Sequence, residues 1–311
     1  MLSLLYRGRL ASCNYDCPYC PFAKRKDDRA TLKQDAAELA RFVDWLRGQP
    51  EGRFNLLFTP WGEALTRRHY RDAIITLSHW PQVARVAVQT NLSNSPQWLA
   101  AANPDRVSLW CSFHPEETPR AGFLQRVQQL QALGVRHSIG MVGIRRFFGE
   151  MAALRQQLPP GTYLWINAYH DEGRRYYSAA ELAWLGQIDP WFALNHQAPP
   201  SLGAPCVTGE RVLSVDGNGD IRRCHFVPAV LGNLYQPALA NPLQTRACPN
   251  RRCDCYIGHA HRPDLPFQQA FGLGTLGRIP EVFHWQAPAD WQPAPPAPPS
   301  PSSRVIRLVA Y

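Results

Sequence analysis

CNYDCPYC, at residues 13–20, directly follows an apolar strand-like segment at residues 2–6 and carries three cysteines in C-x3-C-x2-C spacing. Thiolates at Cys13, Cys17 and Cys20 can each hold one iron of a cubane 4Fe-4S cluster, which leaves the fourth iron without a protein ligand. That open iron is a site for chemistry. A structural zinc site is the alternative, but such sites are closed by four ligands in paired spacings, and no fourth ligand is evident nearby. We therefore expect an iron–sulfur cluster on this loop.

Short apolar segments alternate with longer amphipathic segments on either side of the loop. We expect strands at residues 2–6, 54–59, 83–90, 107–113, 135–142 and 163–167, and helices at 32–46, 66–78, 96–102, 123–134 and 151–158. Strands that alternate with helices are joined in parallel by right-handed crossovers. The sequence therefore predicts an α/β fold, either an open doubly wound sheet or a partial barrel.

The sequence changes character at about residue 200. The segments RVLSV and DIRR, joined by the turn DGNG, predict a β-hairpin instead of a further strand–helix unit. This region also holds a second group of cysteines, at positions 206, 224, 248, 253 and 255. Farther on, residues 287–303 are rich in proline and predict an extended linker.

Composition limits the classes of protein to which the chain can belong. Its 311 residues are 45% hydrophobic and 11% aromatic, which excludes a disordered or fibrous chain. It contains no apolar run long enough to cross a membrane, and residues 1–9 (MLSLLYRGR) lack a secretory apolar region. We therefore expect a cytoplasmic protein whose nine cysteines are metal ligands or core residues instead of disulfides.

The net charge of +9 raises the question of nucleic-acid binding. Only 18% of the residues are charged, and the arginines are scattered along the sequence instead of forming dense basic blocks. Residues 24–26 (KRK) form the one compact basic patch, next to the cysteine loop. We therefore do not expect a nucleic-acid partner.

The cysteine loop resembles that of the radical SAM superfamily. The resemblance includes the aromatic Tyr19 before the third cysteine and the prolines Pro18 and Pro21 that flank it. It implies a partial (β/α)6 TIM-like barrel in which S-adenosylmethionine (SAM) binds the fourth iron through its amino and carboxylate groups. Reductive cleavage of SAM then gives methionine and a 5′-deoxyadenosyl radical that abstracts a hydrogen atom from the substrate.

The same resemblance implies which residues contact SAM. Trp61-Gly62-Glu63 stands where the family has Gly-Gly-Glu, a motif that meets the SAM amino group, and the departure at the first glycine leaves the local backbone path open. Each of the other candidates lies near the carboxyl end of an expected strand, where barrel enzymes build their sites. The expected cofactor-binding residues are Tyr19, Gly62, Glu63, Asn91, Ser112, His114, Gly140, Gly143 and Asn167, and the catalytic candidates are His114 and Tyr169.

The second cysteine group resembles the SPASM and twitch modules, which hold auxiliary 4Fe-4S clusters. Cys206 precedes Gly219 and Cys224 at matching distances, although the closing segment CPNRRCDC departs from the usual C-x2-C. Five thiols for four positions leave one spare, and zinc is the alternative metal. The expected ligands are drawn from Cys206, Cys224, Cys248, Cys253 and Cys255. The implied domains are a barrel at residues 1–199, a cluster module at 200–260 and an extension at 261–311.

Two further motifs are not expected to bind a ligand. GLGTLG at residues 272–277 fits a dinucleotide-binding pattern but lacks the surrounding strand–helix unit. DGNGD from Asp216 begins like a calcium-binding loop, but Ile221 replaces the glycine that such a loop requires.

The resemblance implies a radical SAM enzyme that modifies a peptide or protein, with the net reaction unassigned. An electron donor such as flavodoxin or ferredoxin is the implied redox partner, and no membrane partner is expected. The alternatives are an RNA-modifying radical SAM enzyme, or a non-catalytic protein that binds iron–sulfur clusters or zinc. Polar residues at the strand ends favour catalysis, because an electron carrier needs only the cysteines.

Overall fold

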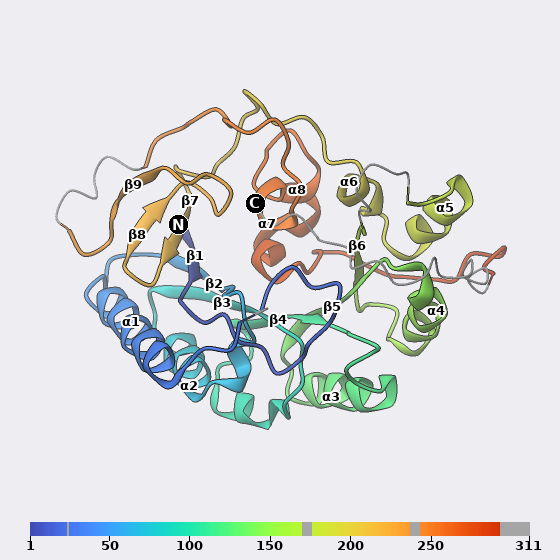
Figure 1. Cartoon of the computed structure of the whole chain (residues 1–311), viewed down its shortest axis with the longest axis horizontal. Helices are drawn as coiled ribbons and strands as arrows, with labels where there is room; N and C mark the ends of the chain where they lie inside the picture. Colours follow the sequence, from blue (N-terminus) through green and yellow to red (C-terminus); the bar gives the residue numbers. More distant parts are fainter. Residues whose placement is uncertain (24, 170–175, 237–242, 293–311) are drawn as a thin grey trace.

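The computed structural model describes residues 1–23, 25–169, 176–236 and 243–292. Within these residues one sheet has nine strands in the order β6-β5-β4-β3-β2-β1-β7-β8-β9 (Figure 1). The first six strands in chain order are all parallel to one another, as the sequence predicts. They are β1 (Leu2–Arg7), β2 (Phe54–Phe58), β3 (Val83–Thr90), β4 (Val107–Ser112), β5 (Arg136–Val142) and β6 (Leu164–Asn167).

The sheet continues beyond β1 into the second half of the chain. Strand β7 (Val212–Asp216) pairs in parallel with β1, and β8 (Asp220–Arg222) and β9 (Val230–Asn233) follow in antiparallel pairing. The predicted hairpin between β7 and β8 is confirmed. Its turn is held by Asp216, which accepts hydrogen bonds from the backbone N–H groups of Asn218 and Asp220, and by Gly219 at φ +88°.

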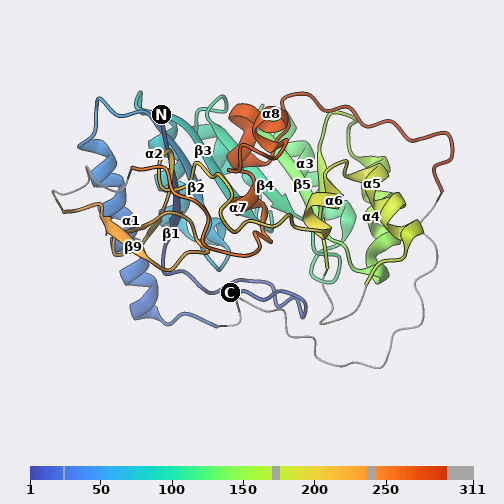
Figure 2. The ribbon, with the colours of Figure 1, turned by 90° about the horizontal axis from the view of Figure 1, so that it is seen from above.

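Helices α1 to α4 cover one face of the sheet (Figures 1 and 2). Helix α1 begins after Asp28, whose side chain accepts a hydrogen bond from the N–H of Thr31, and its apolar stripe packs against the sheet. The helices of the chain are α1 (Arg29–Arg47), α2 (Arg68–Ser78), α3 (Arg120–Ala132), α4 (Phe148–Gln157), α5 (Ala179–Ile188), α6 (Phe192–His196), α7 (Tyr256–His259) and α8 (Phe267–Phe271), with 3-10 turns η1 (Ala64–Thr66), η2 (Pro96–Ala101), η3 (Arg145–Phe147) and η4 (Gly272–Gly277).

The opposite face of the sheet is filled by the segment at residues 256–277. Side chains of α7, α8 and η4 pack against inward-facing strand residues such as Leu57 and Trp110. The glycine-rich GLGTLG forms η4, and the carbonyl of Gly277 accepts a hydrogen bond from the Ser138 hydroxyl. This glycine motif is therefore a packing element on the sheet. Much of the predicted proline-rich linker, from residue 293 onward, lies outside the described residues.

No helix among the described residues is both long and apolar enough to cross a membrane.

Candidate functional site

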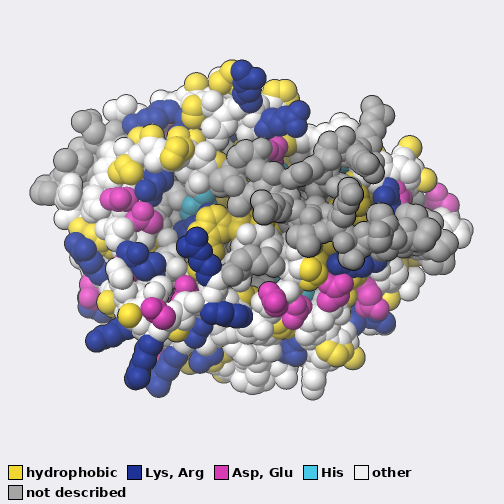
Figure 3. Space-filling model, viewed as in Figure 1, with side chains coloured by type: hydrophobic (Ala, Val, Ile, Leu, Met, Phe, Trp, Pro, Cys, Tyr) yellow, Lys and Arg dark blue, Asp and Glu magenta, His cyan; other side chains and the backbone are white. Residues whose placement is uncertain are grey.

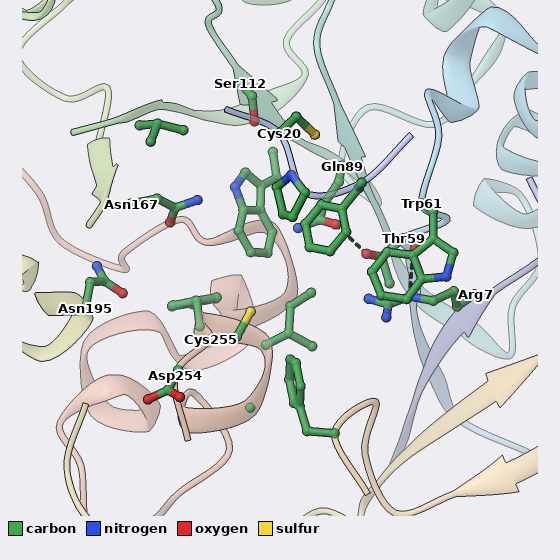
Figure 4. Close-up of a pocket in the computed structure, with 18 of the residues that line it drawn as sticks. Arg7, Cys20, Thr59, Trp61, Gln89, Ser112, Asn167, Asn195, Asp254 and Cys255 are labelled. Carbon is green, nitrogen blue, oxygen red and sulfur yellow. Dashed lines mark hydrogen bonds between the residues drawn. The ribbon is translucent and has the colours of Figure 1, made fainter. Parts of the chain in front are cut away.

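A large cavity of about 1040 Å³ lies at the carboxyl ends of the parallel strands. Its wall contains all three cysteines of the first group and all five of the second. The cavity lies there because side chains alternate between the two faces of each strand. Inward-facing residues such as Leu5 and Leu57 form an apolar layer, and the inward-facing residues two positions later line the cavity (Figure 4). Those lining residues are Arg7, Thr59, Gln89, Ser112, Val142 and Asn167.

The first cysteine loop is held in place by a carboxylate. Asp27 accepts hydrogen bonds from the backbone N–H groups of Ala11 and Ser12, at 2.8 and 2.7 Å, and from the Ser12 hydroxyl. Within the loop, the N–H of Cys20 donates to the carbonyl of Cys17 at 3.1 Å, which makes a tight turn between the two thiols. These hydrogen bonds therefore define the shape of the loop.

The three thiols of this loop lie close enough to influence one another. Burial raises the pKa of Cys17 to about 12, with further increases from Glu117, Cys20 and Cys13. Burial also raises the pKa of Cys13, and Glu63 and Cys20 add to the increase. The ligand form of cysteine is the thiolate, so metal binding at this loop would release protons.

No group of three Cys, His, Asp or Glu side chains in the described ranges is arranged to hold one metal ion. The thiolates of a cubane each bind a different iron, so they need not meet at one point. The result for a single metal ion therefore does not exclude a cluster held by Cys13, Cys17 and Cys20.

Tyr19 is part of the first cysteine loop, and His114 packs against this loop. The Nδ1 atom of His114 is 2.9 Å from the Tyr19 hydroxyl and 3.4 Å from the Cys17 sulfur. Burial lowers the pKa of His114 to about 4, so its imidazole is neutral at pH 7. The neutral imidazole of His114 contacts both Tyr19 and Cys17, so it holds the Cys17 side chain in place and adds no charge beside the thiol.

Glu63 is a buried carboxylate with three hydrogen-bond donors. One oxygen accepts from the Thr90 hydroxyl at 2.7 Å and from the N–H of Leu65, and the other accepts from the N–H of Asn91 at 2.6 Å. The residue is 4% exposed, and burial raises its pKa, although these hydrogen bonds act in the opposite direction. A carboxylate offers about four acceptor positions, so one remains for a ligand in the cavity.

Gly62 occupies a position where no side chain fits. A Cβ atom there would lie 2.1 Å from the carbonyl oxygen of Ser12. The N–H groups of Gly62 and Glu63 donate to the carbonyls of Leu10 and Ser12, so this segment runs directly along the start of the cysteine loop. This backbone path requires glycine at position 62 but leaves room for the side chain of Trp61. The departure from Gly-Gly-Glu at position 61 therefore does not disturb the path.

Of the remaining predicted site residues, four line the cavity and the two glycines of β5 do not. Asn91 reaches the first cysteine loop, where its amide nitrogen is 3.0 Å from the Asn14 side-chain oxygen and 3.6 Å from the Cys13 sulfur. Ser112, Asn167 and Tyr169 also line the cavity.

The two glycines of β5 are placed differently from these residues. Gly140 is covered by the indole of Trp165, and Gly143 lies under the hydroxyl of Tyr177. Neither glycine belongs to the cavity wall. Their role in holding adenine stays a prediction.

The C-terminal cysteines form a second group in the same wall. Burial raises the pKa of Cys224 to about 11, with increases from Cys206 and Cys248. Burial also raises the pKa of Cys253, and Cys255, Cys224, Cys248 and Cys206 add to it. These interactions place the thiols near one another.

Cys255 lies near two arginines that come from outside the second cysteine group. Burial raises its pKa, but Arg7 and Arg278 act in the opposite direction. Its sulfur is drawn among the side chains that line the cavity, at the start of α7 (Figure 4). Cys255 therefore lies between the second cysteine group and the strand ends.

Several cavity residues were not identified from the sequence. Arg7, Thr59 and Gln89 end their strands without belonging to any motif, and Asn195 comes from the short helix α6. The period-2 alternation along each strand is the signal that identifies Arg7 and Gln89, because it puts them on the same face as Leu5 and Ala87.

No known protein family matches this sequence, and no curated protein matches it. The fold does match solved structures. Native anSMEcpe with bound AdoMet superimposes with a TM-score of 0.54 at 14% identity, over 84% of each chain. Native anSMEcpe with bound AdoMet and Kp18Cys peptide gives 0.51 at 13% identity, over 78% of this chain and 80% of that chain. At such identities the likeness shows a shared α/β fold.

Proposed function

We propose that this protein is a radical SAM enzyme. The observation that carries the proposal is the meeting of Cys13, Cys17 and Cys20 with the buried carboxylate of Glu63 in one cavity at the strand ends. The fold supports it, since anSMEcpe, which has a similar fold, was solved with AdoMet bound. A partial (β/α)6 barrel is the architecture that accompanies this proposal.

The residues present fit the cofactors that the proposal requires. Cys13, Cys17 and Cys20 would hold a 4Fe-4S cluster, and Glu63 would hold the SAM amino group through its remaining acceptor position. When bound, the cluster supplies the electron that cleaves SAM to methionine and the 5′-deoxyadenosyl radical. Asn91, His114 and Tyr19 position the loop through the contacts described above.

We further propose an auxiliary 4Fe-4S cluster in the second cysteine group. Cys206, Cys224, Cys248 and Cys253 are the proposed ligands, because the first three of these thiols all add to the raised pKa of Cys253. Cys255 acts on Cys253 as well, so its separate role rests on its position. Cys255 is the spare thiol, since its sulfur is directed into the cavity and lies near Arg7.

The proposed substrate is a peptide or protein. The solved anSMEcpe complex with AdoMet and Kp18Cys peptide supports this class. Against RNA, the Lys and Arg side chains on the face in Figure 3 lie in several separate groups. A flavodoxin or ferredoxin is the proposed electron donor.

Formation of 5′-deoxyadenosine tests the proposal. Protein reconstituted with iron and sulfide under anaerobic conditions is incubated with SAM and a strong reductant, and the nucleoside products are quantified. We expect 5′-deoxyadenosine and methionine in equal amounts from the intact chain, and none from a variant with Cys13, Cys17 and Cys20 all replaced by Ala. Equal product from both proteins would contradict the assignment. An electron carrier or zinc protein would give no product from either.

A further inference from the structure

Arg7 directs a guanidinium group into the cavity from the end of β1 (Figure 4). Its Nε donates to the carbonyl oxygen of Thr59 at 3.0 Å, and its guanidinium carbon lies 4.0 Å from the ring centre of Trp61. The Thr59 hydroxyl in turn donates to the side-chain oxygen of Gln89. The hydrogen bond of Nε to Thr59 and the contact of the guanidinium plane with the Trp61 ring fix the group in one orientation. They leave Nη1 and Nη2 without a hydrogen-bond partner among the described residues.

Arg7 has no carboxylate partner in the part of the chain that the structure describes. Arg145, Arg222 and Arg262 do have one, in Glu181, Asp216 and Asp264. Within the same described ranges, the buried Arg155, Arg223 and Arg278 have none either, but their Nη atoms donate hydrogen bonds to backbone or side-chain oxygens, which those of Arg7 do not. Burial lowers the pKa of Arg7 to about 10, so the group is still charged at pH 7. The acidic group that acts on it is the Cys255 thiol. Arg7 is partly buried, and in the described residues its Nη atoms meet neither a carboxylate nor another oxygen acceptor, so they are available to pair with an anion in the cavity.

An apolar surface adjoins this cation. The rings of Trp61 and Phe22 pack together with centres 4.7 Å apart and planes inclined by 34°, and both stay partly exposed, at 38% and 42%. Both residues line the cavity. A ligand group with an apolar part beside an anionic part would bury the first against the two rings and pair the second with Arg7.

We propose that Arg7 binds a carboxylate of the substrate, while Trp61 and Phe22 cover the apolar group next to that carboxylate. The planar fork of Nη1 and Nη2 matches the two oxygens of a carboxylate. In a peptide, the carboxylate belongs either to the C-terminus or to an Asp or Glu side chain. The inference rests on the proposed function, because it requires a substrate in the cavity together with SAM.

Three capped peptides serve as probes: acetyl-Ala-Ala-Phe as the free acid, the same peptide as its C-terminal amide, and acetyl-Ala-Glu-Phe amide. Their dissociation constants are measured by titration calorimetry on the reconstituted full chain with SAM present. A charge-assisted pair contributes about 1.5–3 kcal/mol, so we expect at least one acidic probe to bind about ten-fold or more tightly than the neutral amide. The free acid identifies a C-terminal site, and the Glu peptide identifies a side-chain site. Equal binding of all three probes overturns the proposal.

Variants assign the preference to Arg7. Arg7→Gln should lose the tighter binding of the acidic peptide over the neutral amide. Arg7→Lys keeps the positive charge and should keep part of this preference. Arg9→Gln is the matched control, because Arg9 lies two residues away on the surface, where it pairs with Glu38, and its replacement should leave the preference intact. If Arg7→Gln fails to fold, the wild-type preference and its reduction in Arg7→Lys decide the outcome. Full preference in either Arg7 variant overturns the proposal.

The test separates this inference from its premise. SAM affinity is measured on the same proteins, and a ten-fold loss in Arg7→Gln would mean that Arg7 serves the SAM carboxylate, which overturns the inference. Wild-type protein that forms 5′-deoxyadenosine but does not prefer the acids contradicts the inference alone. Wild-type protein that prefers the acids but never cleaves SAM contradicts the proposed function alone.

Discussion

Glu63 combines burial with nearly complete hydrogen bonding, and this combination suits it to bind a cationic ligand. Three donors hold its oxygens in fixed directions, so a ligand amino group meets a carboxylate that needs no reorganisation. Burial raises the pKa of Glu63, which means that the charged form of this carboxylate is destabilised unless a positive charge lies next to it. An incoming ammonium group would supply that charge.

Replacement of Glu63 by Gln tests this role. The neutral amide keeps the shape but loses the charge, and its NH2 group would face some of the same donors. A charge-assisted contact contributes roughly 1.5–3 kcal/mol, so SAM binding should weaken about ten-fold or more. Equilibrium dialysis with labelled SAM measures the change on reconstituted protein. Glu51→Gln, at an exposed position, is the control. Unchanged affinity in Glu63→Gln would move the role to another residue.

At the scale of residues, motifs and strand faces could be predicted from the sequence, but the contacts between distant side chains could not. Tyr19, Glu63 and His114 were found because a motif or a strand end marks them, and all three line the cavity. Arg7 carries no motif, and its importance depends on Trp61 and Thr59, which are far from it in sequence. Gly140 was assigned to adenine from its strand alone, although the indole of Trp165 covers it.

At the scale of elements, the contact between Gly140 and Trp165 gives a test of packing. A Cβ atom at Gly140 would lie 2.0 Å from the Trp165 ring, so Gly140→Ala forces the indole or the strand to move. Overpacking of this kind costs about 1–3 kcal/mol of unfolding free energy. Gly149→Ala, in α4, is the matched control, because its Cβ meets nothing within 4 Å. That control should stabilise the helix by up to about 1 kcal/mol. Urea unfolding of the two variants should therefore shift in opposite directions.

The two cysteine groups give a second test at this scale. If Cys253 is a ligand of an auxiliary cluster and Cys255 is not, Cys253→Ala should lower the iron content and Cys255→Ala should not. Each cubane holds four irons, so we expect about eight in the intact chain, about eight in Cys255→Ala and about four in Cys253→Ala. Iron and zinc are quantified by mass spectrometry after anaerobic reconstitution. Loss of iron in Cys255→Ala instead would exchange the two assignments, and zinc in the second site would refute the auxiliary cluster.

The parallel strands could be predicted because each is a short apolar segment bounded by helix caps and turns, as around Asp28 and Gly48. The segment at residues 256–277 could not. Its helices α7 and α8 have only four and five residues, too few for a periodic pattern. They form because Phe267 and Phe271 pack on the inner face of the sheet.

At the scale of the whole molecule, one strand joins the two parts of the site. Strand β1 pairs with β2 on one side and β7 on the other, so the first cysteine loop starts where the two halves of the sheet meet. Both cysteine groups consequently line one cavity although more than 180 residues separate them. The sequence predicts each group separately, but only the pairing of β1 with β7 brings them together.

Burial of histidine throughout the molecule predicts how its stability depends on pH. Burial lowers the pKa of His114 and of His261 to about 4, lowers that of His259 to about 3, and lowers those of His137 and His225. In the unfolded chain a histidine titrates near 6.5, so the folded state binds fewer protons between these values. The resulting stability is fully present above about pH 6.5 and is lost as the pH falls towards 4.

His261 isolates the contribution of one such group. A difference of about 2.5 between its folded pKa of about 4 and its unfolded value corresponds to about 3 kcal/mol. His261→Gln removes the ionisation, so its unfolding free energy should fall less than that of wild type between pH 7 and pH 4. His284→Gln, at an exposed position, is the control and should follow wild type. Urea titrations at each pH are compared as differences from wild type, so that acid loss of bound iron cancels. A variant at position 261 that keeps the full acid sensitivity of wild type would show that this imidazole ionises as freely in the folded chain as in the unfolded one.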